Sequence, residues 1–267
     1  MKPVVSTEQA RQVYHQLLEL TGANNHGDGA IIGKRVTKCR DLTLVRLAGP
    51  FYLVIACDSD GGIGPKPNDT FKAPPFVLGR LATRVPLMEV VASGARPLIL
   101  VDTLSVEMEP TGRAIIQGVQ YEARLAGMTD ADMLTGSTED NVPTTATGMG
   151  VTVIGLAEEK GLRPGRARRD DLVVCVGIPK TAPRDTVDPD DPEIADLPAV
   201  TALAGRDCVH DILPVGSHGG EYECRQMAAA CGMRYIPIPS EIDMVKSAGP
   251  STCVLISLAS QIGRAHV

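Results

Sequence analysis

The chain has 267 residues, a formal net charge of −6 and a hydrophobic fraction of 43%. This length allows one large domain or two modest ones, and the composition is that of a globular protein, which excludes global disorder. Only three Phe, five Tyr and no Trp are present, so the chain lacks the aromatic platforms and the basic groove of a single-stranded nucleic-acid binder.

Hydrophobic periodicity and turn residues predict alternating helices and strands in the first part of the chain. In chain order these are a helix capped by Ser6 that ends at Gly22, strands at Leu42–Leu47 and Phe51–Cys57, a helix at Phe76–Gly94 with a break or kink at Pro86, a strand at Pro97–Met108, a helix at Thr111–Gly127 and a strand at Gly148–Ala157.

The amino-acid composition changes at Glu158–Asp171, where charged residues, Gly and Pro dominate. This change predicts a domain boundary, with domains at residues 1–160 and 161–267. The second part predicts a strand at Asp171–Ile178, an irregular exposed segment at Pro179–Pro198, a helix at Gly220–Cys231 and a strand at Thr252–Leu258. We therefore expect a two-domain protein of the α+β or α/β class.

The sequence also predicts a cytoplasmic protein with no membrane partner. No apolar run approaches the roughly 20 residues that span a bilayer, and Met1–Gly22 lacks the apolar core of a signal peptide. The seven cysteines are scattered without a C-x-x-C pair, a pattern that favours reduced thiols over a zinc site.

Several common catalytic motifs are missing. The pattern G-x-x-x-x-G-K-[ST] fails because Gly33-Lys34 is followed by Arg35, and G-x-G-x-x-G fails because prolines follow Gly62-Ile-Gly64. There is also no H-E-x-x-H motif for zinc and no G-x-S-x-G nucleophile elbow.

Acidic residues instead follow apolar strands or lie in glycine loops. Carboxylates that are brought together repel one another, and a cation allows them to stay ionised. Magnesium fits because it takes oxygen ligands and keeps substrate phosphates in its coordination shell. Alternatively, each acid caps a turn, as Asp often does. The acids concerned are Asp28, Asp58, Asp60, Glu89, Glu139 and Asp140.

Five segments in the same order resemble the superfamily of aminoimidazole ribonucleotide synthetase, thiamine-monophosphate kinase and selenophosphate synthetase. Gly27–Ala30 resembles the G-D-D-A loop, Cys57–Lys66 the T-D-G-V-G-T-K segment, Leu87–Pro97 the N-D-hydrophobic-x-x-x-G-A-x-P helix, Leu134–Glu139 the G-G-[ED]-T motif, and His210–Gly220 the H-D-x-T-x-G-G helix start.

The resemblance implies an N-terminal α+β domain that dimerises into a shared barrel, a C-terminal α/β domain, and ATP bound with Mg²⁺. It implies metal ligation by Asp28, Asp60, Glu89 and Glu139, and catalytic roles for Asp28, Asp60, Lys66, His210 and Asp211. It also implies cofactor contacts from Gly27, Gly29, Gly61, Gly62, Gly64, Gly136, Thr138, Lys246 and Ser247.

Two positions depart from the superfamily pattern. Met88-Glu89 stands where relatives have Asn-Asp, and Ser137 occupies the acidic position of G-G-[ED]-T. Glu139 lies two residues further on and is a candidate replacement.

The second half most resembles the α-ribazole kinases, through His210–Ser217 and Lys246–Thr252. This resemblance implies a kinase that phosphorylates the ribosyl hydroxyl of a nucleoside-like molecule, α-ribazole, in salvage of the cobamide lower ligand. Two alternatives remain open: a thiamine-monophosphate kinase or another ATP-dependent synthetase of the superfamily, and a non-catalytic ATP-binding regulator.

Overall fold

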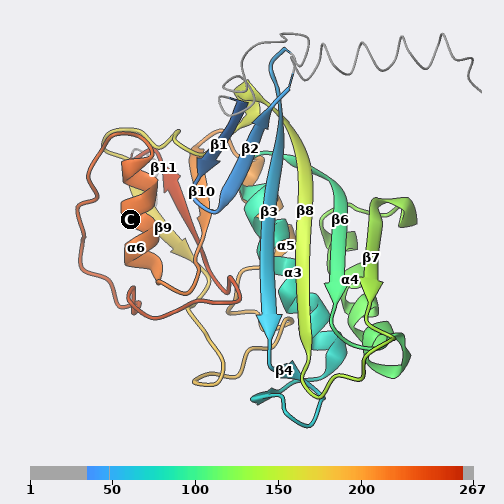
Figure 1. The fold of residues 1–267 in the computed structure, drawn as a ribbon. Coiled ribbons are helices and arrows are strands. Elements are labelled where there is room, and N and C mark those ends of the chain that lie inside the picture. The colour runs from blue at the N-terminus through green and yellow to red at the C-terminus, as the bar shows by residue number, and fades with distance from the viewer. Residues whose placement is uncertain (1–34, 48, 261–267) are drawn as a thin grey trace, which may run out of the picture.

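The computed structural model describes residues 35–47 and 49–260. The predicted helix after Ser6 and the glycine loop with Gly27, Asp28 and Gly29 therefore lie outside the described residues. Within the described part, a six-stranded sheet, a three-stranded sheet, a small two-stranded sheet and four α-helices form the fold (Figure 1). No helix of this part is both long enough and apolar enough to cross a membrane.

The larger sheet has six strands in the order β1-β2-β3-β8-β6-β7. Neighbouring strands are antiparallel except for β6 and β7, which are parallel. The long strands β3 and β8 pair along their whole length and form its centre. The bounds are β1 Val36–Cys39, β2 Leu42–Arg46, β3 Phe51–Gly61, β6 Arg96–Leu104, β7 Leu134–Thr138 and β8 Gly148–Glu158.

Two helices, α3 (Pro75–Ala92) and α4 (Arg113–Leu125), cover one face of this sheet (Figure 1). Short pieces connect the elements. They are the parallel pair β4 (Ile63–Gly64) and β5 (Phe71–Lys72), and the helical turns Met108–Gly112, Ala131–Met133 and Glu159–Gly161.

The smaller sheet is antiparallel and has the order β10-β11-β9. Helix α6 lies on one side of it, and α3 and α5 pack on the side that faces the larger sheet. The bounds are β9 Leu172–Val176, α5 Leu197–Ala204, β10 Val209–Pro214, α6 Gly220–Ala229 and β11 Val254–Leu258.

Most predicted elements in the described part are present, with ends that differ by a few residues. The expected break at Pro86 is wrong, because α3 continues through Pro86 as one helix. Pro86 lacks an N–H and cannot donate to the carbonyl four residues earlier, but its ring is buried in the core, and packing holds the helix together. The strand expected at Pro97–Met108 ends earlier, at Leu104.

Six strands and α-helices were missed because they are short or lie in glycine-rich or polar sequence. They are β1, β4, β5, β7, α5 and β10. In addition, β3 continues past Cys57 to Gly61, so Asp58 and Asp60 lie within a strand and not in the loop that follows it. The alternation along β3 places Cys57 on the uncovered face of the sheet, where its thiol is exposed. All seven cysteines are free thiols.

The segment predicted as irregular, Pro179–Pro198, has no regular structure before α5 begins at Leu197. It is less exposed than expected, since Pro179, Pro189 and Ile194 are buried. The segment packs along α3 and is held there by hydrogen bonds from arginines of that helix.

One hydrophobic core connects the two sheets. It contains Leu87 and Met88 of α3, Val153 of β8, and Ile212 and Ile256 of the smaller sheet. The sheets are built from separate stretches of the chain, residues 36–158 and 172–258. Because this core is shared, the division into domains 1–160 and 161–267 stays a prediction.

Helices α3 and α4 approach closely at two glycines. A Cβ atom on Gly79 would lie 2.1 Å from the carbonyl oxygen of Ile115, and one on Gly118 would lie 2.2 Å from the carbonyl oxygen of Phe76. Real Cβ atoms do not come this close to backbone, so only glycine allows the two helices to pack at this distance.

Buried charges join the two helices where they cross. Glu122 of α4 is fully buried and accepts from Arg84 Nε at 2.6 Å and from Arg80 Nε at 3.1 Å. Arg80 also pairs with Asp190, and Arg84 donates to the carbonyl of Pro189. This ionic network therefore attaches the irregular segment to α3.

We predict that Glu122→Gln lowers the free energy of unfolding by about 3 kcal/mol or more, because it leaves two buried guanidinium groups without their shared carboxylate. Urea-induced unfolding measures the change. The control is Glu109→Gln, which breaks the exposed pair with Arg113 and is expected to cost less than about 1 kcal/mol. Equal losses in the two variants would contradict the assignment.

Candidate active site

Asp58 and Asp60 lie on the face of β3 that points toward the helices. They follow Val54 and Ala56, which are buried on the same face. Burial raises the pKa of Asp60 to about 6, and the neighbouring charge of Asp58 adds to this effect. The Oδ2 atom of Asp60 is buried and has no hydrogen-bond partner among the described residues.

Glu89 projects from the last part of α3 and is 9% exposed. Its pKa is raised to about 8, mainly by burial and then by the carboxylates of Asp41 and Glu223, while Arg40 opposes the shift. No hydrogen bond or ion pair from a described residue reaches this carboxyl group. Glu89 and Asp60 are thus buried carboxyl groups, and no described residue forms a hydrogen bond with the Glu89 carboxyl or with the Asp60 Oδ2 atom.

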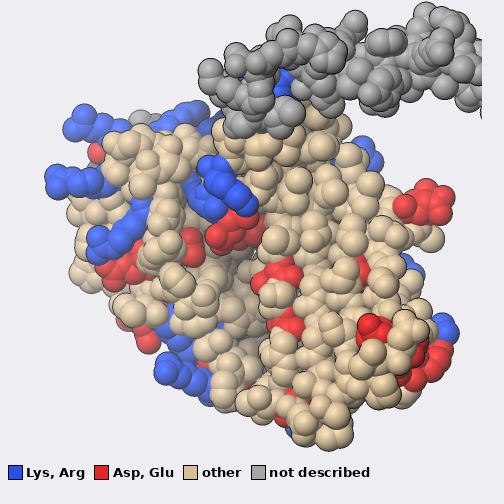
Figure 2. Space-filling view, viewed as in Figure 1, with Lys and Arg blue, Asp and Glu red and all other residues tan. Residues whose placement is uncertain are grey.

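Glu223 belongs to the same junction and comes from α6 of the smaller sheet. Its pKa is raised to about 7 by burial and by Asp41, while Arg40 lowers it. Figure 2 shows acidic side chains along the hollow between the two halves of the molecule. The junction between the sheets therefore collects negative charge from β3, α3, α6 and the β1–β2 turn.

Arg40 is the cation of this junction. It lies in the β1–β2 turn, where its backbone has a φ of 56°, and its guanidinium forms a bidentate ion pair with the Asp211 carboxylate of β10. Asp211 is fully buried and also accepts from the amides of Gly165 at 3.2 Å and Ile212 at 2.9 Å. The ion pair connects the two sheets. It also engages both carboxylate oxygens of Asp211, a residue for which the superfamily resemblance implies a catalytic role.

His210 is buried next to Asp211 on the same strand and not at a helix start. Its Nδ1 lies 2.8 Å from Oδ2 of Asp171, which also accepts from the Ser257 hydroxyl at 2.5 Å. The imidazole therefore forms a buried polar chain within the smaller sheet.

The glycine segment after β3 forms a tight structure. Gly62 has a φ of 71°, and its amide donates to the carbonyl of Thr147 at 2.8 Å. A Cβ on Gly64 would lie 2.5 Å from the Thr147 hydroxyl. A Cβ on Gly61 would meet open space. Asp69 closes the loop by accepting from the amides of Lys66 and Thr147 at 2.7 and 2.6 Å.

Lys66 is already paired in this structure. Its Nζ forms an ion pair with Glu107, and this contact together with a hydrogen bond from Thr111 lowers the pKa of Glu107 to about 2. A phosphate group near Lys66 would therefore compete with a carboxylate for the ammonium group.

The residues predicted around β7 have local roles. A Cβ on Gly136 would lie 1.5 Å from Oδ1 of Asp102, so the two strands can pair only with glycine here. Thr138 donates to Asp140 at 2.7 Å. Glu139 accepts from the amides of Asn141 and Val142, so it caps the turn, which is the alternative that the sequence left open.

Lys246 and Ser247 contact the irregular segment. Lys246 Nζ pairs with Asp185 at 2.8 Å, and the Ser247 hydroxyl lies 3.5 Å from that of Thr181. These contacts place the predicted cofactor residues of the second half against residues 181–185, and the structure gives them no contact with Asp60 or Glu89.

The structure therefore brings Glu89 and Asp211 to the junction of the two sheets, where both interact with Arg40, and it links Asp60 to this junction through Asp58. Lys66, Glu139 and Lys246 lie in separate local networks. Within the described residues, no group of three or more His, Cys, Asp or Glu side chains is arranged to hold a metal ion. Met88, the departure beside Glu89, is fully buried in the hydrophobic core.

Sequence reasoning missed Arg40, Asp41 and Glu223. Arg40 and Asp41 stand in a two-residue turn between strands, where no motif marks them. Glu223 is in the first turn of α6, after the glycine pair at Gly219-Gly220, and acidic residues are common there because they favour a helix N-terminus. Their role becomes visible only when the two sheets are placed together.

Comparison with known proteins places these observations in context. Residues 40–157, a little under half of the chain, match the family described as AIR synthase related protein, N-terminal domain. No curated protein sequence matches the chain at a significant level.

Solved structures match over most of the chain. Thiamine-monophosphate kinase from Stenotrophomonas maltophilia K279a has a TM-score of 0.56 and 16% identity, covering 99% of this chain and 89% of that one. AaThiL complexed with AMPPCP and TMP has a TM-score of 0.55 and 14% identity, with coverage of 98% and 89%. T. maritima PurL complexed with ADP has a TM-score of 0.55 and 13% identity, with coverage of 86% and 38%.

At these identities the likeness establishes the fold alone. The chain has the mixed α and β fold of these proteins, and residues 40–157 match the family model that agrees with the sequence motifs. The α-ribazole kinase branch, the shared barrel and the two-domain division stay predictions.

We predict that the stability of the protein falls as pH rises from about 4.5 to about 8, because the folded state keeps a proton on Glu89 that the unfolded state has released. Glu89→Gln should remove part of this dependence. At pH 8, Mg²⁺ should raise the melting temperature of the wild type more than that of the variant. Thermal unfolding across this pH range measures both effects.

The matched control is Glu241→Gln, at an exposed position, which should keep the wild-type profile. A Glu89→Gln variant with the same pH profile and the same response to Mg²⁺ as the wild type would contradict the prediction.

Proposed function

We propose that the protein is an ATP-dependent kinase that transfers the γ-phosphate to a hydroxyl group of a small nucleoside-like molecule, with α-ribazole as the acceptor. One observation carries the proposal. Asp60 and Glu89 are buried close to Asp58 with raised pKa values, and no described residue forms a hydrogen bond with the Asp60 Oδ2 atom or the Glu89 carboxyl. Such carboxylates are suited to a bound cation.

The residues fit Mg²⁺ with its nucleotide. Asp60 and Glu89 would hold the ion, with Asp58 beside them and Asp28 outside the described residues. Two or three carboxylates suffice, because Mg²⁺ keeps waters and phosphate oxygens in its shell. When bound, the ion neutralises charge on the phosphates. Glu139 fits less well, since its carboxylate caps a turn.

Other parts of the ATP site are proposed from the superfamily pattern. Gly61, Gly62 and Gly64 would line the phosphates, and Lys66 would offset their charge after it leaves or shares its pair with Glu107. Several amides of this loop already donate within the protein. We therefore expect the Lys66–Glu107 pair to rearrange when nucleotide binds.

In the proposed reaction the acceptor oxygen forms a bond to the γ-phosphorus while the bond to the ADP oxygen breaks. Phosphoryl transfer depends mainly on positioning and charge stabilisation. The resemblance implies catalytic roles for His210 and Asp211, but both are buried and engaged with Asp171 and Arg40. Glu223 is the better candidate, because its pKa of about 7 suits a general base near neutral pH.

We further propose that the protein forms a homodimer through the uncovered face of the larger sheet. Ile55, Ile154 and Ile99 lie in one row across three strands on the side opposite the helices, and Ile99 is 43% exposed. No described helix covers this face (Figure 1). A contiguous apolar face of this kind is typical of an interface between subunits.

A thiamine-monophosphate kinase is the second candidate. It is favoured by the likeness in fold to AaThiL complexed with AMPPCP and TMP and to the Stenotrophomonas maltophilia enzyme. The two candidates share the proposed ATP site and differ in the acceptor.

We predict that incubation with ATP and Mg²⁺ yields ADP and a phosphorylated product when α-ribazole is supplied in a panel with other nucleosides and thiamine monophosphate. Asp60→Asn should lower turnover on the order of 100-fold or more, because it removes a charge that holds the cation, while the circular dichroism spectrum stays unchanged. Asp132→Asn, at an exposed position, is the matched control.

A normal rate in Asp60→Asn would contradict the metal assignment. A product only with thiamine monophosphate would select the second candidate. Binding of ATP without ADP formation from any acceptor would instead identify a nucleotide-binding regulator.

We predict that Ile99→Asp halves the molar mass measured by sedimentation equilibrium, because it places a charge in the apolar dimer face. The monomer should stay folded, since the side chain is exposed in the single chain. Val142→Asp, in a loop and 62% exposed, should leave the mass unchanged. An unaltered mass in Ile99→Asp would exclude this face as the interface.

A further inference from the structure

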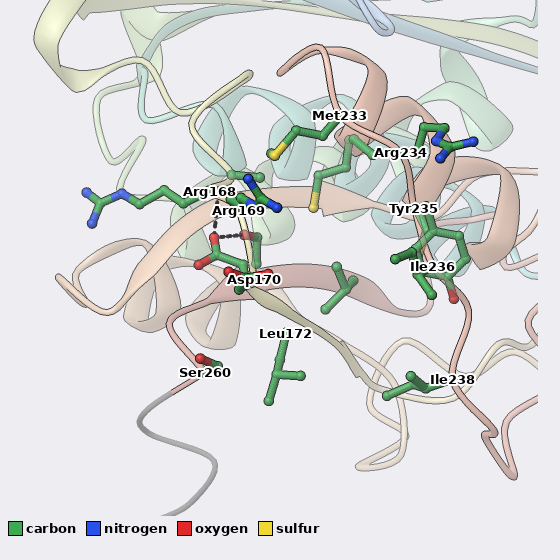
Figure 3. Close-up of a pocket in the computed structure, with 17 residues that line it drawn as sticks. Arg168, Arg169, Asp170, Leu172, Met233, Arg234, Tyr235, Ile236, Ile238 and Ser260 are labelled. Atoms are coloured by element: carbon green, nitrogen blue, oxygen red, sulfur yellow. Dashed lines mark hydrogen bonds between the residues drawn. The ribbon is translucent and has the colours of Figure 1, made fainter.

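The smaller sheet carries a cavity on the side of α6. Its volume is about 750 Å³, and it lies between α6, β9, the loop 167–171 and the extended segment 233–238 (Figure 3). Pockets for small molecules commonly have 300 to 1,000 Å³, so the cavity is large enough for an organic ligand. It is separate from the carboxylates at the junction of the sheets, none of which lines it.

Most of the cavity wall is apolar. Its side chains include flexible methionines and a tyrosine, which adapt to the shape of an organic group. Two isoleucines stand at its open side, Ile236 at 80% and Ile238 at 63% exposure. Exposed apolar side chains gathered around a cavity are unusual for a surface that contacts only water. The apolar lining comprises Leu172, Met227, Met233, Tyr235, Ile236 and Ile238.

Three arginines also line the cavity: Arg168, Arg169 and Arg234. None of their guanidinium groups forms an ion pair with a described carboxylate. Figure 3 shows Arg169 reaching toward the middle of the cavity, whereas Arg168 and Arg234 point outward.

What distinguishes these three arginines from other arginines without an ion pair among the described residues, such as Arg46 and Arg124, is that they gather around one apolar cavity. The arginines that form ion pairs elsewhere are Arg40, Arg80, Arg84, Arg113 and Arg225. In a chain with a net charge of −6, unpaired guanidinium groups around an apolar cavity produce a local site for an anion.

The aspartate inside the cavity does not neutralise these arginines. Oδ2 of Asp171 already accepts from His210, from the Ser257 hydroxyl and from the amide of Arg168. The other lining aspartate, Asp170, lies at the exposed rim. The lining therefore carries three arginines, and Asp170 is the one lining carboxylate outside the buried polar chain of Asp171. The net charge of the lining without that chain is positive.

We propose that this cavity binds an amphipathic anion, that is, an aromatic or branched aliphatic group that carries a sulfonate, carboxylate or phosphate. The apolar group occupies the space between Met227, Leu172 and Ile236, and the acidic group pairs with Arg169. Desolvation of both parts makes this charge-assisted contact stronger than a similar one at an open surface.

The test compares two fluorescent probes that differ only in the anionic sulfonate group: 8-anilinonaphthalene-1-sulfonate and its uncharged counterpart without the sulfonate, N-phenyl-1-naphthylamine. We expect one sulfonate probe per chain, bound about tenfold more tightly than the uncharged probe, as a charged hydrogen bond predicts. Arg169→Gln should remove this difference by weakening only the sulfonate probe. Ile236→Ser should weaken both probes.

Two control variants match these changes outside the cavity. Arg113→Gln removes an exposed guanidinium on α4, and Val245→Ser shortens an apolar side chain that is 71% exposed. Both should bind the probes as the wild type does. All substituted side chains are exposed, so thermal unfolding should show that the variants keep their fold.

Equal affinity for the two probes, or an unchanged difference in Arg169→Gln, would overturn the proposal. So would binding that Ile236→Ser leaves intact, because the probe would then lie elsewhere. If the wild type instead self-associates with rising concentration and Ile236→Ser abolishes this, the surface is an interface for another polypeptide and not a small-molecule site.

Discussion

Helix α3 lies between the larger and the smaller sheet, and its packing on both sides constrains everything around it. It contacts β3, β6 and β8 on one side and α5 and β10 on the other, and most of its residues from Leu78 to Ala92 are buried. A helix buried almost all round has no polar face where charges can be hydrated. Every charged residue on it therefore needs a partner within the protein or from a bound ligand.

The two ends of α3 meet this requirement differently. Near its start, Arg80 and Arg84 share Glu122, and they also hold the irregular segment through Asp190 and Pro189. These charges are compensated, so their role is structural. Near its end, Glu89 is buried without a hydrogen bond or ion pair from a described residue and has a raised pKa. The first part of α3 therefore carries a structural ionic network, and its last part carries a carboxyl group suited to a bound cation.

Much of the architecture could be predicted from local patterns. The alternation of Gly148–Ala157 predicts β8 well, because burial of one face imposes a strong period. The apolar residues of Phe76–Gly94 recur at helical spacing and predict α3, although that helix is buried on nearly all sides. Short elements such as β10 and α5 were missed, since five to eight residues carry little periodic signal. The extent of β3 was also underestimated, because Asp58 and Asp60 are polar residues in a strand, and only pairing with β8 keeps them extended.

The sequence by itself determined the alternating helices and strands, the superfamily resemblance and the acids Asp60 and Glu89 as candidates, since these depend on local spacing and residue type. Tertiary structure decided which candidates share a site. Glu139 caps a turn, and Lys66 forms an ion pair with Glu107. Arg40 and Glu223, which are 183 residues apart in the sequence, interact electrostatically at the junction of the sheets. Burial and opposing charge set these roles, and both depend on neighbours that are distant in the chain.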